Sequence, residues 1–154
     1  MSNLPKISAV MCTYRRFSCV ERSINFFLNQ TYPNKELIIY NTDTYDKYLD
    51  NNCKLAPYSI LIINNNTDFH TKEPYTNVGA IRRDALTFAG GDYVVTWDDD
   101  DIYMPWFMQQ AMDRISETNK PAFKPPYSWF FQGNRLELVR NTMEASVVAE
   151  ISRV

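Results

Sequence analysis

Glycine, cysteine and histidine are scarce in this chain: its 154 residues include four glycines, three cysteines and one histidine. Cys12, Cys19 and Cys53 are odd in number and form no C-x-x-C pair, which argues against a disulfide framework or a zinc ribbon. The single histidine, His70, lies in a polar segment, so neither a multi-histidine metal site nor Ser-His-Asp hydrolysis is favoured, and we expect it at the surface. Cys12 is interpreted as a small buried residue rather than a nucleophile.

Long apolar runs and an excess of basic charge are also missing. No run approaches the roughly 20 residues needed to cross a bilayer, and residues 1–6 do not resemble a signal peptide. The net charge of −2 and the scattered basic residues disfavour a stable nucleic-acid complex. We therefore expect a cytoplasmic protein without a membrane span. With 45% apolar residues, a chain of this length can form one hydrophobic core. We therefore expect a single domain over residues 1–154.

The apolar patterns alternate between strands and helices, which predicts a parallel α/β core. Ser18 and Glu21 have capping-box spacing ahead of one helical face, Asn77 is placed to cap a second helix, and Pro105 suits the first turn of a third. Buried strands are predicted over residues 7–12, 36–40, 58–63 and 92–97.

The pattern changes after the proline-rich residues 120–126. Gly133 and Asn134 form a two-residue hairpin signal between residues 129–132 and 135–139. Residues 145–151 look like one more strand.

Four consecutive aspartates, Asp98, Asp99, Asp100 and Asp101, follow directly after a predicted core strand. Neighbouring carboxylates repel by about 1 kcal/mol per pair in water and by more in a cleft, so the run favours a bound cation. Oxygen ligands select Mg²⁺ or Mn²⁺, which at a strand end usually serves a phosphorylated ligand. Because strand side chains alternate, Asp98 and Asp100 are expected on one face, in a D-x-D arrangement. The alternative is an acidic turn that caps the next helix.

Three segments, in this order, resemble the family-two glycosyltransferases of the GT-A fold. They are residues 7–16 (ISAVMCTYRR), residues 77–84 (NVGAIRRD) and residues 91–101 (GDYVVTWDDDD). The resemblance covers roughly residues 6–117. It implies a Rossmann-like three-layer α/β sandwich with a mostly parallel sheet and a C-terminal β-hairpin region.

The resemblance also implies roles for individual residues. Arg83, or alternatively Arg82, would face the donor's diphosphate, and a guanidinium near a helix start is chemically suited to pair with phosphate. Asp98 and Asp100 would hold the ribose and the metal. The remaining assignments are nucleotide-sugar contacts for Thr13, Tyr14, Arg16 and Asp99, and catalytic roles for Asp100 and Asp101.

The chain departs from the family pattern in two places. After the second strand the family has an acidic pair that contacts the base, whereas this chain has Asn41 and Asp43; an amide both donates and accepts hydrogen bonds, while a carboxylate only accepts. Near the C-terminus the family's Glu-Asp pair, which supplies the catalytic base, has no clear counterpart. Glu144 is the candidate for that base.

Other enzyme classes fit less well. A nucleotidyltransferase is expected to have a glycine-rich loop after the first strand, but residues 13–16 contain no glycine. A phosphatase with an aspartyl nucleophile is expected to have its Asp-x-Asp after the first strand, whereas here the aspartates follow the fourth. The aromatic residues near the acidic run and in the hairpin are open to two interpretations, stacking on sugars or packing in the core. They are Tyr103, Trp106, Tyr127 and Trp129.

The leading hypothesis is a Mn²⁺- or Mg²⁺-dependent transferase that moves a sugar from a nucleoside-diphosphate sugar to an unknown acceptor hydroxyl, with inversion. Residues 1–117 would form the donor half and residues 118–154 a partial acceptor side. The alternative is a truncated, non-catalytic module that binds sugar nucleotides or serves in assembly. A second copy or a partner chain could complete the site.

Overall fold

The computed structural model describes residues 4–45, 53–55, 59–141 and 151–153. Its elements follow in the order β1 (Ile7–Thr13), α1 (Phe17–Leu28), β2 (Lys35–Asn41), β3 (Cys53–Leu55), β4 (Ile60–Asn64), α2 (Val78–Leu86), β5 (Tyr93–Thr96), α3 (Phe107–Thr118), β6 (Ala122–Phe123), β7 (Tyr127–Gln132), β8 (Arg135–Arg140) and β9 (Ile151–Arg153). The predicted alternation of strands and helices is confirmed.

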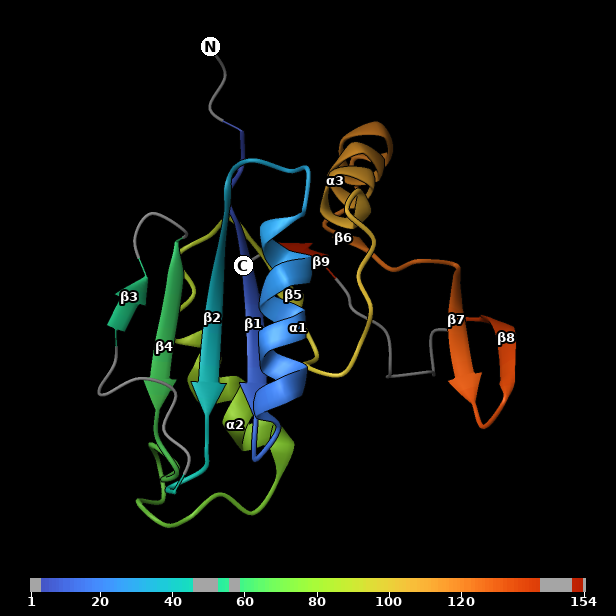
Figure 1. Cartoon of the computed structure of the whole chain (residues 1–154). Coiled ribbons are helices and arrows are strands. Elements are labelled where there is room, and N and C mark those ends of the chain that lie inside the picture. Colours follow the sequence, from blue (N-terminus) through green and yellow to red (C-terminus); the bar gives the residue numbers. More distant parts are fainter. Residues whose placement is uncertain (1–3, 46–52, 56–58, 142–150, 154) are drawn as a thin grey trace.

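The main sheet has the strand order β3-β4-β2-β1-β5-β9-β6 (Figure 1). Strands β4, β2, β1 and β5 run parallel to one another, while β3 and β9 pair antiparallel with their neighbours. The parallel strands therefore end at a common edge of the sheet, where ligands bind in open α/β folds.

Helices cover both faces of this sheet. On one face, Phe27 of α1 and Met108 of α3 pack with Ile7, Leu37 and other strand residues in a single apolar cluster. On the other face, Ala85 of α2 packs against a second cluster that includes Tyr40. Burial on both faces explains why the central strands read as continuous apolar runs. The predicted three-layer arrangement is confirmed.

The helix starts were predicted with mixed success. Asn77 caps α2 as expected, because its side chain accepts a hydrogen bond from the Ala80 amide. The capping box at Ser18 and Glu21 is wrong: α1 begins at Phe17, after Arg16, and no side chain caps it. Helix α3 begins at Phe107, two residues after the proline that was expected in its first turn.

The chain passes very close to β1 just before β5 begins. A Cβ atom on Gly91 would lie 2.7 Å from the Lys6 carbonyl oxygen and 2.7 Å from Ser8 Oγ. Ser8 uses this closeness, since its hydroxyl accepts a hydrogen bond from the Gly91 amide at 2.9 Å and donates one to Glu36 at 2.6 Å. Glycine at position 91 therefore allows β5 to align with β1.

The C-terminal part contains the predicted hairpin. Strands β7 and β8 form a separate two-stranded sheet around Gly133, whose φ of +61° suits the tight turn. Figure 1 shows this hairpin set apart from the main sheet. Strands β3 and β6 were not predicted. The strand expected over residues 145–151 falls almost entirely outside the described residues, and β9 begins at its last residue.

Candidate active site

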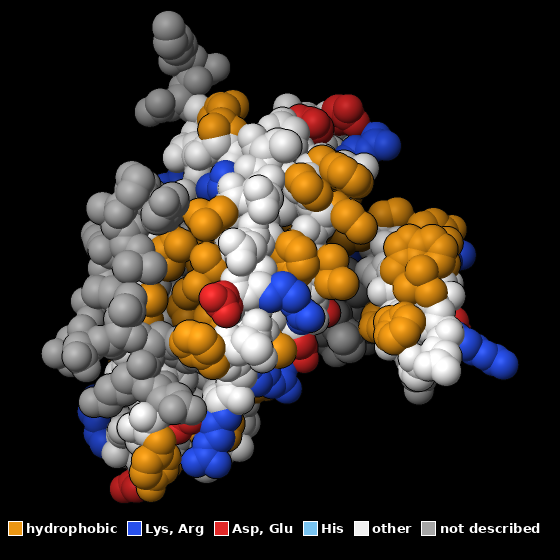
Figure 2. Space-filling view, viewed as in Figure 1, with side chains coloured by type: hydrophobic (Ala, Val, Ile, Leu, Met, Phe, Trp, Pro, Cys, Tyr) orange, Lys and Arg blue, Asp and Glu red, His pale blue; other side chains and the backbone are white. Residues whose placement is uncertain are grey.

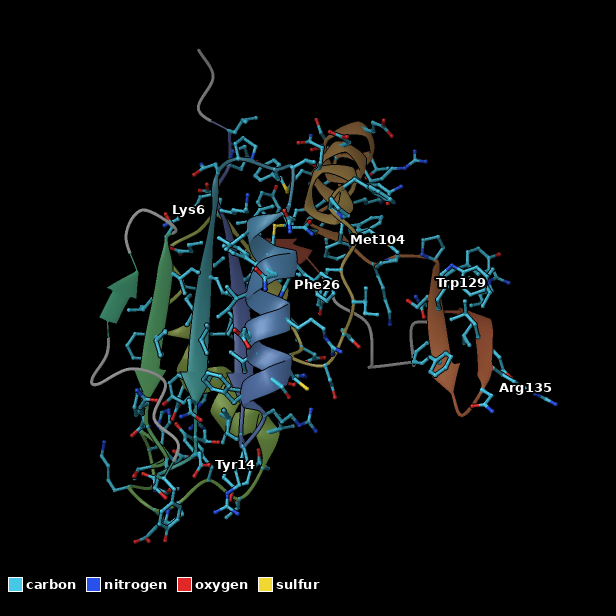
Figure 3. The ribbon with its side chains drawn as sticks, viewed as in Figure 1. Lys6, Tyr14, Phe26, Met104, Trp129 and Arg135 are labelled. Carbon is cyan, nitrogen blue, oxygen red and sulfur yellow. The ribbon has the colours of Figure 1, made fainter. Side chains whose placement is uncertain are left out.

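The polar side chains singled out in the sequence gather at the carboxyl edge of the parallel strands. Thr13 ends β1, Asn41 ends β2, and the acidic turn, residues 98–101, follows β5. Tyr14 lies at this end of the molecule and Lys6 at the opposite end (Figure 3). The fold thus brings together residues from distant parts of the sequence.

Asp99 is the buried member of the acidic turn, with 3% of its surface exposed. Its Oδ2 accepts a hydrogen bond from Thr13 Oγ1 at 2.7 Å, and its Oδ1 accepts one from Arg16 Nη1 at 3.0 Å. A buried carboxylate is costly unless it is paired and hydrogen-bonded, and these two donors meet that need. Asp99 therefore ties the acidic turn to the loop between β1 and α1.

Asp100 is exposed but is also held from the α1 side. The same Arg16 Nη1 donates to Asp100 Oδ2 at 2.7 Å, and Arg22 of α1 donates to the Asp100 carbonyl oxygen at 3.2 Å. Asp99 and Asp100 thus share one guanidinium nitrogen. Strand β5 ends at Thr96, so the acidic turn lies outside the strand. The alternation of side chains expected along the four aspartates is therefore broken.

Asp98 faces a different helix. Its Oδ1 accepts a hydrogen bond from Arg82 Nη2 of α2 at 2.9 Å, and its backbone amide donates to the hydroxyl of Tyr103 at 2.9 Å. The acidic turn is therefore flanked by Arg16 on one side and Arg82 on the other. Both cations reduce the repulsion among the carboxylates.

Asp101 forms no ion pair or hydrogen bond in the described part of the chain. Partial burial, with the negative charges of Asp98, Asp100 and Asp99, raises its pKa to about 6.

Burial likewise raises the pKa of the Cys12 thiol to about 12, so this thiol stays protonated at neutral pH, as expected of a packing residue.

Arg83 belongs to another network. Its Nε donates to Asp84 Oδ1 at 2.9 Å and its Nη2 donates to Asp68 Oδ1 at 2.8 Å. Asp84 is 1% exposed and also accepts hydrogen bonds from the Phe69 amide and the Tyr75 hydroxyl. The network fastens the loop before α2 to the helix. Of the two arginines considered for the diphosphate, Arg82 is the one that faces the acidic turn.

Asn41 and Asp43 are both buried. Asn41 binds its neighbours: its Nδ2 donates to Asn64 at 2.9 Å, and its Oδ1 accepts from the Asp43 amide at 3.0 Å. Among the described residues, Asp43 Oδ2 is buried without a hydrogen-bond partner, although Arg15 Nε forms an ion pair with it at 3.4 Å. Such an atom is costly to leave unsatisfied, so it points to a missing donor.

Arg15 has an unusual backbone and aromatic neighbours. Its φ of +55° lies in the left-handed region, which side-chain-bearing residues rarely adopt outside constrained sites. Its guanidinium carbon lies 5.1 Å from the ring centre of Tyr14 and 5.8 Å from that of Tyr45. Arg15 therefore contacts two tyrosine rings as well as the buried Asp43 carboxylate.

Two carboxylates of the acidic turn have oxygen atoms for a metal ion that arrives with its substrate. Asp98 Oδ1 and Asp100 Oδ2 accept from arginines, whereas the described residues donate no hydrogen bond to their other oxygens. Within residues 4–45, 53–55, 59–141 and 151–153, no group of three or more His, Cys, Asp or Glu side chains could hold a metal ion. Mg²⁺ is commonly bound by one or two carboxylates completed by substrate phosphates, and this donor set fits that arrangement.

The other candidates have varied outcomes. Glu144 lies outside the described residues. His70 is exposed, as expected, and Tyr103 packs in the core, whereas Trp106, Tyr127 and Trp129 are exposed. Arg15 and Arg22 were not given site roles, because their contacts with Asp43 and Asp100 join residues far apart in the sequence. Tyr103 was considered for sugar stacking or core packing, and its hydrogen bond with the Asp98 amide was not predicted.

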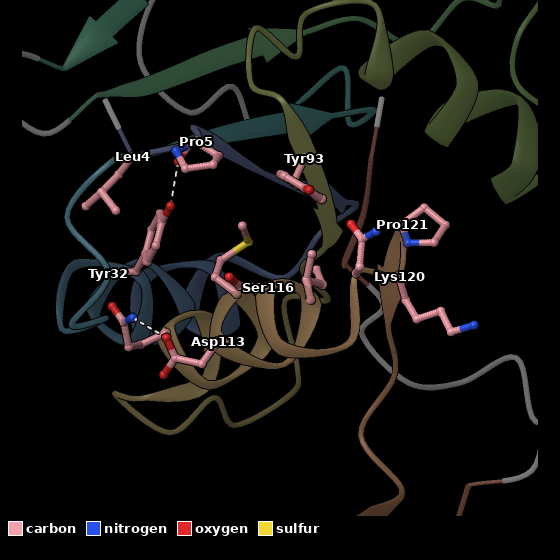
Figure 4. Close-up of a pocket in the computed structure, with 12 residues that line it drawn as sticks. Leu4, Pro5, Tyr32, Tyr93, Asp113, Ser116, Lys120 and Pro121 are labelled. Atoms are coloured by element: carbon pink, nitrogen blue, oxygen red, sulfur yellow. Dashed lines mark hydrogen bonds between the residues drawn. The ribbon is translucent and has the colours of Figure 1, made fainter. Parts of the chain in front are cut away.

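Two further surfaces lie away from the acidic turn. A pocket of about 490 Å³ lies by the amino-terminal ends of β1 and β5, with Pro5, Tyr32 and Tyr93 in its lining; there Tyr32 donates a hydrogen bond to the Pro5 carbonyl oxygen at 2.6 Å (Figure 4). Hydrophobic side chains also gather on the hairpin (Figure 2). The exposed ones there are Tyr127, Trp129, Phe130, Phe131, Leu136, Leu138 and Val139.

Comparison with known proteins decides the family. The sequence model described as "Glycosyl transferase family 2" matches residues 8–146, nearly the whole chain. The chain belongs to this family. An uncharacterized glycosyltransferase of Haemophilus influenzae is 28% identical over 77% of the chain. A cholesterol galactosyltransferase of Borreliella burgdorferi is 29% identical over 74% of it.

Solved structures show the same fold. The family 2 chain is similar to S. aureus TarS (residues 1–349), with a TM-score of 0.61 and 18% identity over 76% of the chain and 34% of TarS. It is also similar to the mannosyltransferase PcManGT of Pyrobaculum calidifontis, solved with GDP-Man and Mn²⁺, with a TM-score of 0.59 and 17% identity over 81% of the chain and 37% of PcManGT. The GT-A fold expected from the sequence is confirmed.

The chain is shorter than these relatives. It spans 35% of the Haemophilus protein and 30% of the Borreliella protein.

Among the described residues, none of the helices has the length and apolar character required to span a bilayer.

Proposed function

We propose that this family 2 domain binds a nucleoside-diphosphate sugar at the acidic turn, together with Mn²⁺ or Mg²⁺, and transfers the sugar to an acceptor hydroxyl. The observation that carries the proposal is the acidic turn itself. It lies at the carboxyl edge of a parallel sheet, where Arg16 and Arg82 hold three of its carboxylates from opposite sides.

Arg82 is the proposed partner of the diphosphate. Its side chain is 40% exposed and uses Nη2 to bind Asp98, which leaves further N–H groups of the planar guanidinium for phosphate oxygens. Arg83 is occupied by two carboxylates, Asp68 and Asp84, and is proposed to stabilise α2 rather than to bind the donor.

Asp98 and Asp100 are the proposed metal ligands. A bound divalent cation would stabilise, as a Lewis acid, the negative charge that develops on the departing diphosphate. Asp99 would act differently, because both of its oxygens are already bonded to Thr13 and Arg16. Its proposed role is to hold its two neighbours at the edge of the sheet.

Asp43 is proposed to select the base. Its buried Oδ2 can only accept a hydrogen bond, so the base that pairs with it must present an N–H donor, and the donor we propose is a ring N–H group. Uracil and guanine have such a group, whereas cytosine and adenine have a ring acceptor at the corresponding position. Structures of the neighbours contain UDP-GlcNAc or GDP-Man, which agrees with either choice.

The proposed transfer is a direct displacement, which inverts the anomeric centre. The acceptor oxygen forms a bond to the anomeric carbon while the bond from that carbon to the phosphate oxygen breaks, and the nucleoside diphosphate leaves with the electron pair. A carboxylate takes the acceptor's proton. Asp101, the carboxylate of the acidic turn without an arginine partner among the described residues, and Glu144 are the candidates for this base.

Turnover separates the enzyme from a non-catalytic module. Purified chain is incubated with UDP- and GDP-sugars, Mn²⁺ and a panel of acceptor alcohols, and the released nucleoside diphosphate is measured. Wild-type turnover that is lost in Asp100→Ala supports the transferase. Metal-dependent binding without turnover across the panel would support the donor-binding module instead, with residues 1–117 as the binding half.

A further inference from the structure

Tyr103, the second residue after the acidic turn, reaches back to the beginning of that turn. Tyr103 is 6% exposed, and its hydroxyl accepts a hydrogen bond from the Asp98 amide at 2.9 Å. The same hydroxyl donates to the carbonyl oxygen of Thr96 at 3.4 Å, a longer contact. One oxygen atom therefore joins the end of β5 to the first residue of the acidic turn.

The ring of Tyr103 is fixed by the core rather than by the turn. It stacks on Trp97 with ring centres 3.7 Å apart and planes inclined by 14°. Trp97 is fully buried, donates from Nε1 to Ser23 Oγ at 2.9 Å, and meets the edge of Phe27. A chain of contacts thus runs from α1 through Trp97 to the hydroxyl of Tyr103.

The Tyr103 hydroxyl contacts the backbone of the acidic turn, whereas Arg16 and Arg82 contact its carboxylates. Arg16 holds the carboxylates of Asp99 and Asp100, and Arg82 holds the carboxylate of Asp98 from an exposed helix face. The described contact that fixes the backbone at Asp98 comes from Tyr103. Because the backbone sets the direction of the Cα–Cβ bond, it also sets where the Asp98 carboxylate lies.

We propose that Tyr103 is a positioning residue of the donor site: its hydroxyl holds the Asp98 backbone so that the Asp98 carboxylate stays aligned with Arg82 and with the bound donor. This inference rests on the proposed function. Repulsion among the four carboxylates tends to spread the turn, and a rigid buried donor–acceptor pair opposes that spreading.

Tyr103→Phe tests the proposal because it removes one oxygen and keeps the ring that stacks on Trp97. Titration calorimetry measures the affinity of UDP and GDP in Mn²⁺, and hydrogen exchange measures protection of the Asp98 amide. We expect faster exchange at Asp98 and nucleotide binding weakened roughly 10- to 100-fold, the scale seen when outer partners of metal ligands are removed.

Tyr32→Phe is the matched control. Tyr32 is also buried and its hydroxyl also binds a backbone group, but it lies in the pocket beside the amino-terminal ends of the strands. We expect this variant to lose some thermal stability and to bind nucleotide like the wild type.

The outcomes are distinguishable. Unchanged nucleotide affinity or unchanged Asp98 exchange in Tyr103→Phe overturns the positioning role. An equal loss of affinity in Tyr32→Phe also overturns it, since the effect would then follow from stability alone. Wild-type protein that binds neither nucleotide in Mn²⁺ contradicts the proposed function itself.

Discussion

Arg82 donates a hydrogen bond to Asp98 over 2.9 Å and so joins α2 to the end of β5. The contact lies at the edge where a phosphorylated ligand is expected, and 32% of the Asp98 side chain remains exposed. An ion pair as exposed as this one contributes little to the stability of the fold. Arg82 and Asp98 therefore both remain available to bind a ligand.

Arg82→Gln should weaken binding of the nucleoside diphosphate without unfolding the chain. Hydrogen bonds to charged groups are worth about 1.5–3 kcal/mol, so the dissociation constant should rise by roughly 10- to 100-fold. Arg83→Gln is the matched control: it should lower the melting temperature, because Asp84 is buried, and leave nucleotide affinity near the wild-type value. Calorimetric titration and thermal unfolding of both variants check this. The reverse pattern would assign the diphosphate to Arg83.

The base preference follows from Asp43. UDP and GDP should bind in Mn²⁺, and CDP and ADP should bind at least roughly tenfold more weakly, because a buried carboxylate facing a ring acceptor leaves both unsatisfied. Asp43→Asn should reduce this discrimination, since an amide can also donate. Competition titrations with the four nucleotides measure it, and equal affinities in the wild type would remove Asp43 from base recognition.

Gly91 should be the glycine near β1 least able to accept a side chain. Gly91→Ala places a Cβ atom 2.7 Å from the Lys6 carbonyl oxygen, so the chain must shift. Overpacking of this kind costs about 1–3 kcal/mol. Gly90→Ala is the control, because its Cβ would meet its nearest atom, in the Glu36 side chain, at 3.4 Å. Chemical denaturation compares the two variants; equal losses would show that the close approach to β1 is not what matters.

The parts of the molecule that depend on local sequence were predictable. Asn77 capped its helix and Gly133 marked its hairpin, because both act through neighbours in the chain. The capping box failed because α1 begins earlier than the pattern suggested. It begins next to Arg16, whose side chain is used by Asp99 and Asp100 instead.

The parts that depend on packing were not predictable. Arg82 and Arg83 are adjacent, and neighbouring helix positions differ by about 100° around the axis, so the rotation of α2 alone decides which one faces Asp98. Tyr103 could be read as a sugar-stacking residue or a core residue. Its contact with the Asp98 amide depends on how it stacks on Trp97, which the sequence does not reveal.

Asp84 should make the fold sensitive to acid. Burial alone would raise the pKa of Asp84, but hydrogen bonds from Arg83, the Phe69 amide and the Tyr75 hydroxyl outweigh it and hold the pKa below the ordinary value of 3.8. The unfolded chain therefore takes up this proton at a higher pH than the folded chain does. The stabilisation from Asp84 is complete above about pH 3.8 and is lost as the pH falls through the lower folded pKa.

Asp84→Asn removes this carboxylate at nearly constant shape. We expect its melting temperature to lie below that of the wild type at pH 7, and the difference to shrink as the pH falls below 4. Asp68, which also accepts a hydrogen bond from Arg83, stays in place in this variant. Asp113→Asn, on the exposed face of α3, controls for the change in net charge. Thermal unfolding of the three proteins between pH 3 and 7 tests the prediction, and a difference that stays constant over this range would mean that Asp84 contributes through shape and not through its charge.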